Sequence, residues 1–404
     1  MPTTLDTAAL SLGAQKLAQA KEFLRSSPLE AWLLVVRESK DRPDPSLRLF
    51  TEQDFTWNSF FLVTPGRSAA LVATFDAPDL ERSGLFDEVR TYKEGARAAL
   101  VSLLGELNPR SIGLNFSKDD ALADGLTAGL KDSVEEMLRG TPLAGRLQSA
   151  EQLVALLRGV KLPIERELIR SAVDETEGMF DRAAREFRLG MSAREIAGVF
   201  HREAARAGVP TAWSSRHCPT VTIGPNAAIG HVSPGDERID RGCVVHVDFG
   251  IVRSGYCSDL QRAWYVAGEG DAAAPEPVRR AYAAVVGGIE LAAGALIPGT
   301  PGWEVDLKVR THLTSLGYPE YAHALGHHLG RAVHDGGGVL GPRWERYGRA
   351  PYEAVREGHV YTLEPSLHLP DHGLISLEED VAVGPRGAEF LSRFPRELPV
   401  LTLS

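Results

Sequence analysis

Two stretches of the chain, VVHVDFG (residues 244–250) and YCSDLQRAWYV (residues 256–266), contain one aspartate each, Asp248 and Asp259. Both are rich in apolar residues, and the Arg253-Ser254-Gly255 segment between them is typical of a tight turn, so they predict a β-hairpin. If the turn is centred on Arg253 and Ser254, the two aspartates lie directly opposite one another, with Cβ atoms about 5 Å apart. Carboxylates that close repel one another and resist burial. A divalent cation between them is the simplest way to stabilise the pair.

A second pair of acids repeats this pattern nearer the C-terminus. Glu364 lies in HVYTLEPSLHL (residues 359–369) and Glu378 lies in LISLEEDVAVG (residues 374–384). The segment between them, residues 370–373, is rich in turn-forming residues. A three-residue loop centred on Asp371 places Glu364 opposite Glu378. The C-terminal half is therefore predicted to contain two hairpins, each with a facing pair of acids.

Between the two hairpins lies a histidine cluster, HALGHHLGRAVHD (residues 323–335), which contains His323, His327, His328 and His334. Four carboxylates and one imidazole can hold two metal ions, and a set this rich in oxygen suits Mn, Co, Fe or Zn. A single strand aspartate is usually exposed to solvent, and a histidine-rich loop is more often structural than metal-binding. The joint occurrence favours a metal site, because each acid lies in an apolar strand where an unpaired charge is costly.

The order VDFG, YCSDLQR, ALGHHLGRAVHD, TLEPSL and LEEDVAV resembles the pita-bread metallopeptidases, which include methionine aminopeptidases, aminopeptidase P, prolidase and creatinase. The matching motifs run from His231 to Glu378. The resemblance implies two divalent metal ions, Mn being preferred over Co, Zn or Fe, with Asp259 as the bridging aspartate. Because Glu379 and Asp380 follow Glu378 directly, the register of the last ligand is the least determined. The implied metal ligands are Asp248, Asp259, His327, Glu364 and Glu378.

The resemblance also implies roles for other histidines. His231 and His334 match positions on the substrate side of the metal centre, where they would stabilise the developing oxyanion. His323 matches a substrate-binding histidine of many prolidase-like members. His328 stands where the family usually has glycine, and Ser376 stands where many members have arginine.

The implied reaction is hydrolysis of a peptide bond by a hydroxide held between the two metal ions, because such ions lower the pKa of a shared water. Glu364 is the candidate to take the proton of the nucleophile and pass it to the leaving nitrogen. A protein of this fold that binds peptides or proteins without catalysis is the alternative of another class, but the ligand set is complete here.

The predicted substrate is an Xaa-Pro dipeptide, and the alternative is an aminopeptidase P that acts on longer peptides. A methionine aminopeptidase is usually shorter at its N-terminus, and creatinase chemistry needs no metal. A dipeptidase needs a cation for the free carboxylate of its substrate. Because Ser376 replaces the usual arginine, Arg48 or Arg42 of the N-terminal region is predicted to bind this carboxylate, with Arg48 preferred.

Composition agrees with a soluble enzyme. The chain has 404 residues, a net charge of -10 and three cysteines without a CxxC pair, which argues against nucleic-acid binding and against a disulfide framework. No signal peptide or membrane span is visible. We expect a cytoplasmic homodimer that acts on small peptides.

The chain is predicted to be an α/β (α+β) protein with two domains. Residues 1–155 alternate strands and helices and resemble a creatinase-type N-terminal domain, whereas residues 156–404 form the pita-bread domain. Strands are expected in residues 30–39, 59–75 and 111–116, and helices in residues 10–24, 94–107, 121–140, 163–207 with a break near Gly190, 277–295 and 303–316.

Overall fold

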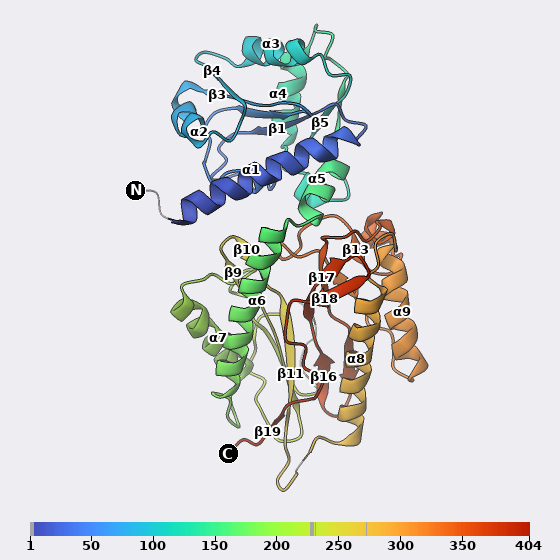
Figure 1. Ribbon diagram of the computed structural model, residues 1–404. Helices are drawn as coiled ribbons and strands as arrows, with labels where there is room; N and C mark the ends of the chain where they lie inside the picture. Colours follow the sequence, from blue (N-terminus) through green and yellow to red (C-terminus); the bar gives the residue numbers. More distant parts are fainter. Residues whose placement is uncertain (1–3, 227–229, 231, 272) are drawn as a thin grey trace. The chain divides into compact units, whose positions relative to one another are not determined.

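The computed structural model describes residues 4–226, 230, 232–271 and 273–404, without the side chains of residues 4–11. The chain divides into two compact units, Met1–Arg158 and Gly159–Ser404. Both units mix helices and strands, so the predicted α/β class is confirmed (Figure 1). The boundary expected between residues 155 and 156 falls inside the last helix before the division. In the described part of the chain, no helix is long and apolar enough to cross a membrane.

The first unit is a six-stranded mixed sheet with strand order β4-β3-β2-β1-β5-β6. Its elements are α1 (Thr4–Arg25), β1 (Ala31–Val36), β2 (Ser59–Val63), β3 (Ser68–Ala73), α2 (Ala77–Ser83), β4 (Glu88–Tyr92), α3 (Arg97–Leu107), β5 (Ile112–Leu114), α4 (Ala128–Leu138), β6 (Leu147–Ser149) and α5 (Glu151–Gly159).

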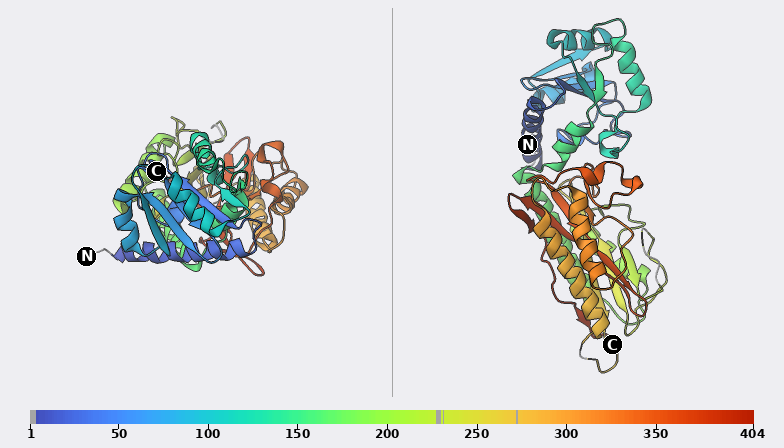
Figure 2. Two further views of the ribbon diagram at one scale, coloured as in Figure 1. Left: turned by 90° about the horizontal axis from the view of Figure 1, so that it is seen from above. Right: turned by 90° about the vertical axis from the view of Figure 1, so that its right-hand side faces the viewer.

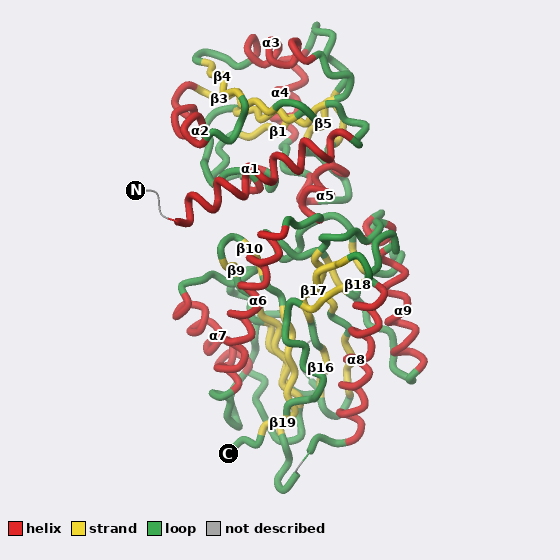
Figure 3. The backbone as a smooth tube through the Cα atoms, viewed as in Figure 1, coloured by secondary structure: helices red, strands yellow, loops and turns green. Residues whose placement is uncertain are grey.

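Both faces of this sheet are buried. Trp32 and Leu34 of β1 pack in one core with residues of α1 and α5, whereas Leu33 and Val35 pack in a second core with residues of α3 and α4. A strand buried on both faces reads as a continuous apolar run, which explains the AWLLVV sequence of β1. The helix pairs on opposite faces are visible in Figure 3.

The second unit contains the two acid-bearing hairpins. Its elements are α6 (Pro163–Ala184), α7 (Ala193–Ala207), β7 (Thr220–Ile223), β8 (Val244–Phe249), β9 (Val252–Arg253), β10 (Tyr256–Cys257), β11 (Leu260–Val266), α8 (Glu276–Ala295), α9 (Gly302–Ser315), β12 (Gly326–His327), β13 (Val339–Leu340), β14 (Val360–Leu363), β15 (Ser366–Leu369), β16 (Gly373–Ser376), β17 (Glu379–Gly384), β18 (Gly387–Phe390) and β19 (Val400–Leu401).

The helices of this unit come in two pairs. α6 contacts α7 and the β9–β11 strands, whereas α8 contacts α9 and the strands β14, β15, β16 and β18 (Figure 1). The side-by-side packing of α8 and α9 is clear in the right-hand view of Figure 2. The break predicted near Gly190 is confirmed: φ of Gly190 is 78°, and α7 begins with a capping box between Ser192 and Glu195.

The first hairpin forms, but its predicted register is wrong. Its strands pair Arg253 with Tyr256, so the turn is centred on Ser254 and Gly255, with φ of 50° and 77°. Positive φ at both central positions is the geometry that suits the twist of a two-residue hairpin, and glycine at the second position favours it. The register therefore moves by two residues, and Asp248 lies opposite Gln261 instead of Asp259.

The predicted register of the second hairpin is confirmed. β15 pairs with β16 from Ser366 opposite Ser376 to Leu369 opposite Gly373, which leaves a three-residue loop centred on Asp371. β14 pairs with β17 in the same register, with Leu363 opposite Glu379. Glu364 and Glu378 come at the junction of these two ladders.

Candidate metal centre

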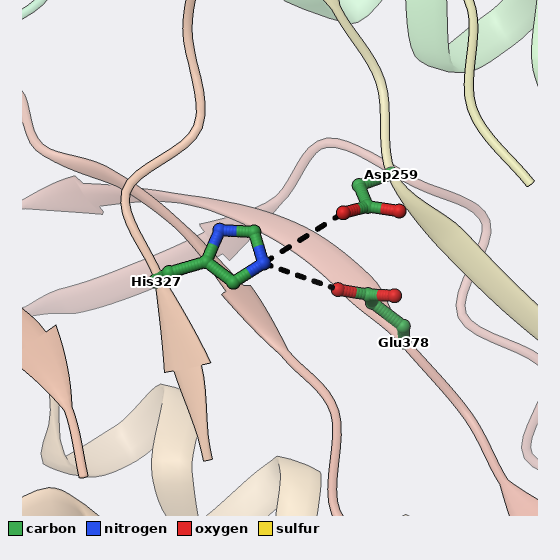
Figure 4. Close-up of side chains that lie close together, drawn as sticks. All are labelled: Asp259, His327 and Glu378. Carbon is green, nitrogen blue, oxygen red and sulfur yellow. Dashed lines mark ion pairs between the residues drawn. The ribbon is translucent and has the colours of Figure 1, made fainter. Parts of the chain in front are cut away.

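The five predicted ligands lie in or next to five different strands of the second unit. Asp248 is in β8, Asp259 precedes β11, His327 ends β12, Glu364 follows β14 and Glu378 precedes β17. One ligand atom each of Asp259, His327 and Glu378 lies within 4.8 Å of the others (Figure 4). The structure therefore brings residues that are more than a hundred positions apart into one cluster.

His327 presents one ring nitrogen to the acids. Its Nδ1 lies 3.2 Å from the backbone oxygen of His328, which assigns the ring proton to Nδ1. Its Nε2 lies 3.7 Å from Asp259 Oδ2, 3.6 Å from Glu364 Oε1 and 4.0 Å from Glu378 Oε1. These separations are too long for hydrogen bonds. They can be spanned by a cation about 2.0–2.2 Å from each ligand atom.

The cluster has a buried base and an accessible side. The side chain of Glu378 is 1% exposed and that of Asp259 is 7% exposed, whereas His327 and Glu364 are 16% and 20% exposed. A cation and a substrate would therefore reach the cluster past His327 and Glu364.

Burial and mutual repulsion perturb every acid of the cluster. Burial raises the pKa of Asp248 to about 7. Burial, followed by the charges of neighbouring acids, raises the pKa of Asp259, Glu364 and Glu378 well above their usual values. Burial, followed by the nearby His334, lowers the pKa of His327 to about 3, so its ring is neutral. A bound cation would favour the ionised form of these acids, and a neutral imidazole has a lone pair for it.

The donor set fits a metal. Asp248 Oδ1, Asp259 Oδ1 and Glu378 Oε1 are buried oxygens that have no hydrogen-bond partner among the residues that the structure describes. Unpaired buried oxygens are rare in folded proteins because each one loses its hydration. Together with the neutral histidine, these carboxylates form an oxygen-rich donor set with one nitrogen, of the kind that binds Mn, Co, Fe or Zn.

The consecutive acids at 378–380 point in different directions. Glu378 faces His327, whereas Glu379 binds Arg262, with 2.8 Å between Oε1 and Nη1. Asp380 Oδ2 accepts a hydrogen bond of 3.1 Å from the backbone nitrogen of Asp259. Of the three acids, Glu378 is thus the one that faces His327, and Asp380 is a supporting residue that the sequence did not reveal.

The structure describes two of the three other predicted histidines, His334 and His323. The ring of His334 packs edge-to-face on His327, with centroids 4.4 Å apart. His323 is engaged through both ring nitrogens, with Nε2 2.8 Å from Ser366 Oγ and Nδ1 2.7 Å from the oxygen of Ala324. His231 lies outside the described residues.

His328 and Ser376, where the sequence departs from the family pattern, are both buried. The ring of His328 stacks on Tyr361 of β14, with centroids 4.2 Å apart. Ser376 donates a hydrogen bond of 3.3 Å to the oxygen of Pro365. His328 thus packs against the strand that leads to Glu364.

The two predicted substrate arginines, both in the first unit, differ in whether their charge is already paired. Arg48 pairs with Asp54 and donates to the oxygen of Gln53 at 3.2 Å. Arg42 is exposed, and its guanidinium group makes no hydrogen bond or ion pair among the described residues. Arg42 is therefore the arginine whose charge is available to a ligand.

Sequence comparison agrees with this centre. Residues 167–385, more than half of the chain, match the profile of metallopeptidase family M24. The chain belongs to metallopeptidase family M24. All five candidate ligands lie within the matched range, and the predicted resemblance to the pita-bread enzymes is confirmed.

Relatives of this M24 metallopeptidase are found by sequence and by structure. The Xaa-Pro dipeptidase of Pyrococcus furiosus is 26% identical over 275 residues, which are 68% of this chain and 74% of that protein. The fold is similar to an Xaa-Pro dipeptidase from Bacillus anthracis, with a TM-score of 0.74, 20% identity and coverage of 96% of this chain and 100% of the other. An X-Pro aminopeptidase from Thermotoga maritima has a TM-score of 0.71, 22% identity and coverage of 96% and 99%.

Gln261 and His246 are further residues that sequence reasoning missed. Gln261 contacts two of the candidate ligands, and His246 contacts Gln261. A glutamine within an apolar strand, two positions after a ligand, was the available signal. The wrong hairpin register hid its significance, because it placed Asp259 in the position that Gln261 occupies.

Proposed function

We propose that this M24 metallopeptidase is a dinuclear-metal Xaa-Pro dipeptidase. The observation that supports this most directly is the cluster of three acids, Asp259, Glu364 and Glu378, within 4.0 Å of the free Nε2 of His327. The relative from Pyrococcus furiosus named Xaa-Pro dipeptidase supports the substrate class. Manganese, a homodimer and a cytoplasmic location remain predictions from the sequence.

Asp248, Asp259, His327, Glu364 and Glu378 would hold the two ions. Bound divalent ions polarise a carbonyl group and lower the pKa of water. Glu364 is the more accessible of the two glutamates, so it is placed to take the proton of the attacking water and pass it to the leaving nitrogen. His334 and His231 are the proposed donors to the developing oxyanion.

The test is hydrolysis of Ala-Pro, Ala-Pro-Ala and Met-Ala-Ser by the full chain, with Mn²⁺ and with a chelator. Ala-Pro cleavage that requires metal is expected. Asp259→Asn and His327→Ala are expected to abolish it, whereas Asp174→Asn, an exposed site on α6, serves as the matched control. Full activity of folded Asp259→Asn or His327→Ala would refute the metal centre, and preference for Met-Ala-Ser would indicate methionine aminopeptidase activity.

The preference for dipeptides is the finer part of this proposal. An arginine that binds the free carboxylate of a dipeptide contributes about 1.5–3 kcal/mol, or roughly 10- to 150-fold in kcat/KM. We therefore expect Arg42→Ala or Arg48→Ala to lower the ratio of dipeptide to tripeptide kcat/KM by this factor. Arg42 is the stronger candidate, because Arg48 is already paired with Asp54. An unchanged ratio in both variants would favour an aminopeptidase P.

A further inference from the structure

Gln261 joins the two acid-bearing hairpins. It lies opposite Asp248 in the β8–β11 ladder. Its backbone also exchanges two hydrogen bonds with Glu378, of 3.4 Å and 3.3 Å, which form an isolated bridge. One residue is thus fixed by backbone contacts to a ligand from each hairpin.

The side chain of Gln261 contacts both glutamate ligands. Its Nε2 lies 2.9 Å from Glu378 Oε2 and 3.5 Å from Glu364 Oε2. The other oxygen of each carboxylate, Oε1, is the one that faces His327 Nε2. A single amide group therefore holds the rear oxygen of both carboxylates and leaves the forward oxygens for a cation.

His246 determines which way the amide points. His246 Nε2 lies 3.0 Å from Gln261 Oε1, and Nδ1 of the same ring is buried and meets no hydrogen-bond partner in the described part of the chain. Carboxylates that bind a metal are ionised and only accept hydrogen bonds, so the NH₂ of Gln261 must face the glutamates. Its oxygen then accepts the N–H of His246.

We propose that Gln261, oriented by His246, is a positioning residue that sets the metal affinity of Glu364 and Glu378. The inference rests on the proposed metal centre. The amide limits the rotation of both carboxylates and places a partial positive charge behind them. Partners of this kind typically change metal affinity by roughly 10- to 100-fold when they are removed.

The test is Mn²⁺ binding to the chelator-treated full chain, measured by isothermal titration calorimetry. Gln261→Met keeps the length of the side chain and removes both polar atoms, and it is expected to weaken Mn²⁺ binding by roughly 10- to 100-fold. Asn115→Leu is the matched control, because Asn115 is a buried amide in the first unit that donates to Asp44 at 3.0 Å. Its loss should leave Mn²⁺ affinity within about twofold of wild type.

His246→Leu separates positioning from a merely structural role. It should weaken Mn²⁺ binding in the wild-type background, and it should have no further effect in the Gln261→Met background, because it acts only through the amide. The His246→Leu result also stands alone if Gln261→Met does not fold. Equal losses in both backgrounds, or Mn²⁺ binding by Gln261→Met within about twofold of wild type, would overturn the inference.

The outcome for the wild-type chain distinguishes the two proposals. If wild type does not bind Mn²⁺, the proposed metal centre fails. If wild type binds Mn²⁺ and hydrolyses Ala-Pro while both variants bind as tightly, only the role of Gln261 fails.

Discussion

Asp248→Asn should remove activity and yet stabilise the metal-free protein. Burial raises the pKa of Asp248 to about 7 from an ordinary value of 3.8. The folded chain therefore holds this proton more tightly than the unfolded chain. The stability contributed by the protonated acid is complete below pH 3.8 and is lost as the pH rises to 7, because ionisation is easier in the unfolded chain.

The magnitude follows from the two pKa values. At 1.36 kcal/mol per unit, the raised pKa of Asp248 costs the fold roughly 4 kcal/mol at pH 8, where the folded acid is ionised. It costs roughly 2 kcal/mol at pH 5, where the folded chain keeps a proton that the unfolded chain releases. Asparagine carries no charge, so the variant should recover most of this cost. The gain in the free energy of unfolding should therefore be larger at pH 8 than at pH 5.

The assay is urea unfolding of chelator-treated wild type and Asp248→Asn at both pH values. Asp174→Asn, at an exposed position of α6, is the control and should change stability by less than about 0.5 kcal/mol. Saturating Mn²⁺ should reverse the order, because it stabilises wild type through a ligand that the variant lacks. A metal-free variant that is less stable than wild type at pH 8, or a gain independent of pH, would refute the reasoning.

Two further predictions concern the loop and strand around the nitrogen ligand. Asp335→Ala should destabilise the protein by about 3–5 kcal/mol in urea unfolding, because it removes the carboxylate that lies 2.9 Å from the buried ammonium of Lys161. Adding Lys161→Met should restore much of that loss, and a double variant no more stable than the single one would contradict the explanation. Gly326→Ala should weaken Mn²⁺ binding and cost about 1–3 kcal/mol, because a Cβ there would lie 1.9 Å from the backbone oxygen of Thr362. Gly105→Ala, where a Cβ meets no atom within 4 Å, should not destabilise, and equal behaviour of the two variants would exclude the steric argument.

The sequence determined the chemical character of the site. Acids inside apolar strands need a partner wherever the strands lie, so Asp248, Asp259, Glu364 and Glu378 could be selected before the fold was known. The loop around Asp371 could also be predicted, because residues 370–373 are rich in turn formers.

Only the tertiary structure decided how the site is supported. A two-residue change of hairpin register keeps every side chain on its own face, so the hydrophobic pattern cannot distinguish the two registers. The positive φ angles of Ser254 and Gly255 centre the turn on these two residues, and the resulting register places Gln261 opposite Asp248. The contact of Gln261 with Glu378 joins residues 117 positions apart, and such a contact leaves no local trace in the sequence.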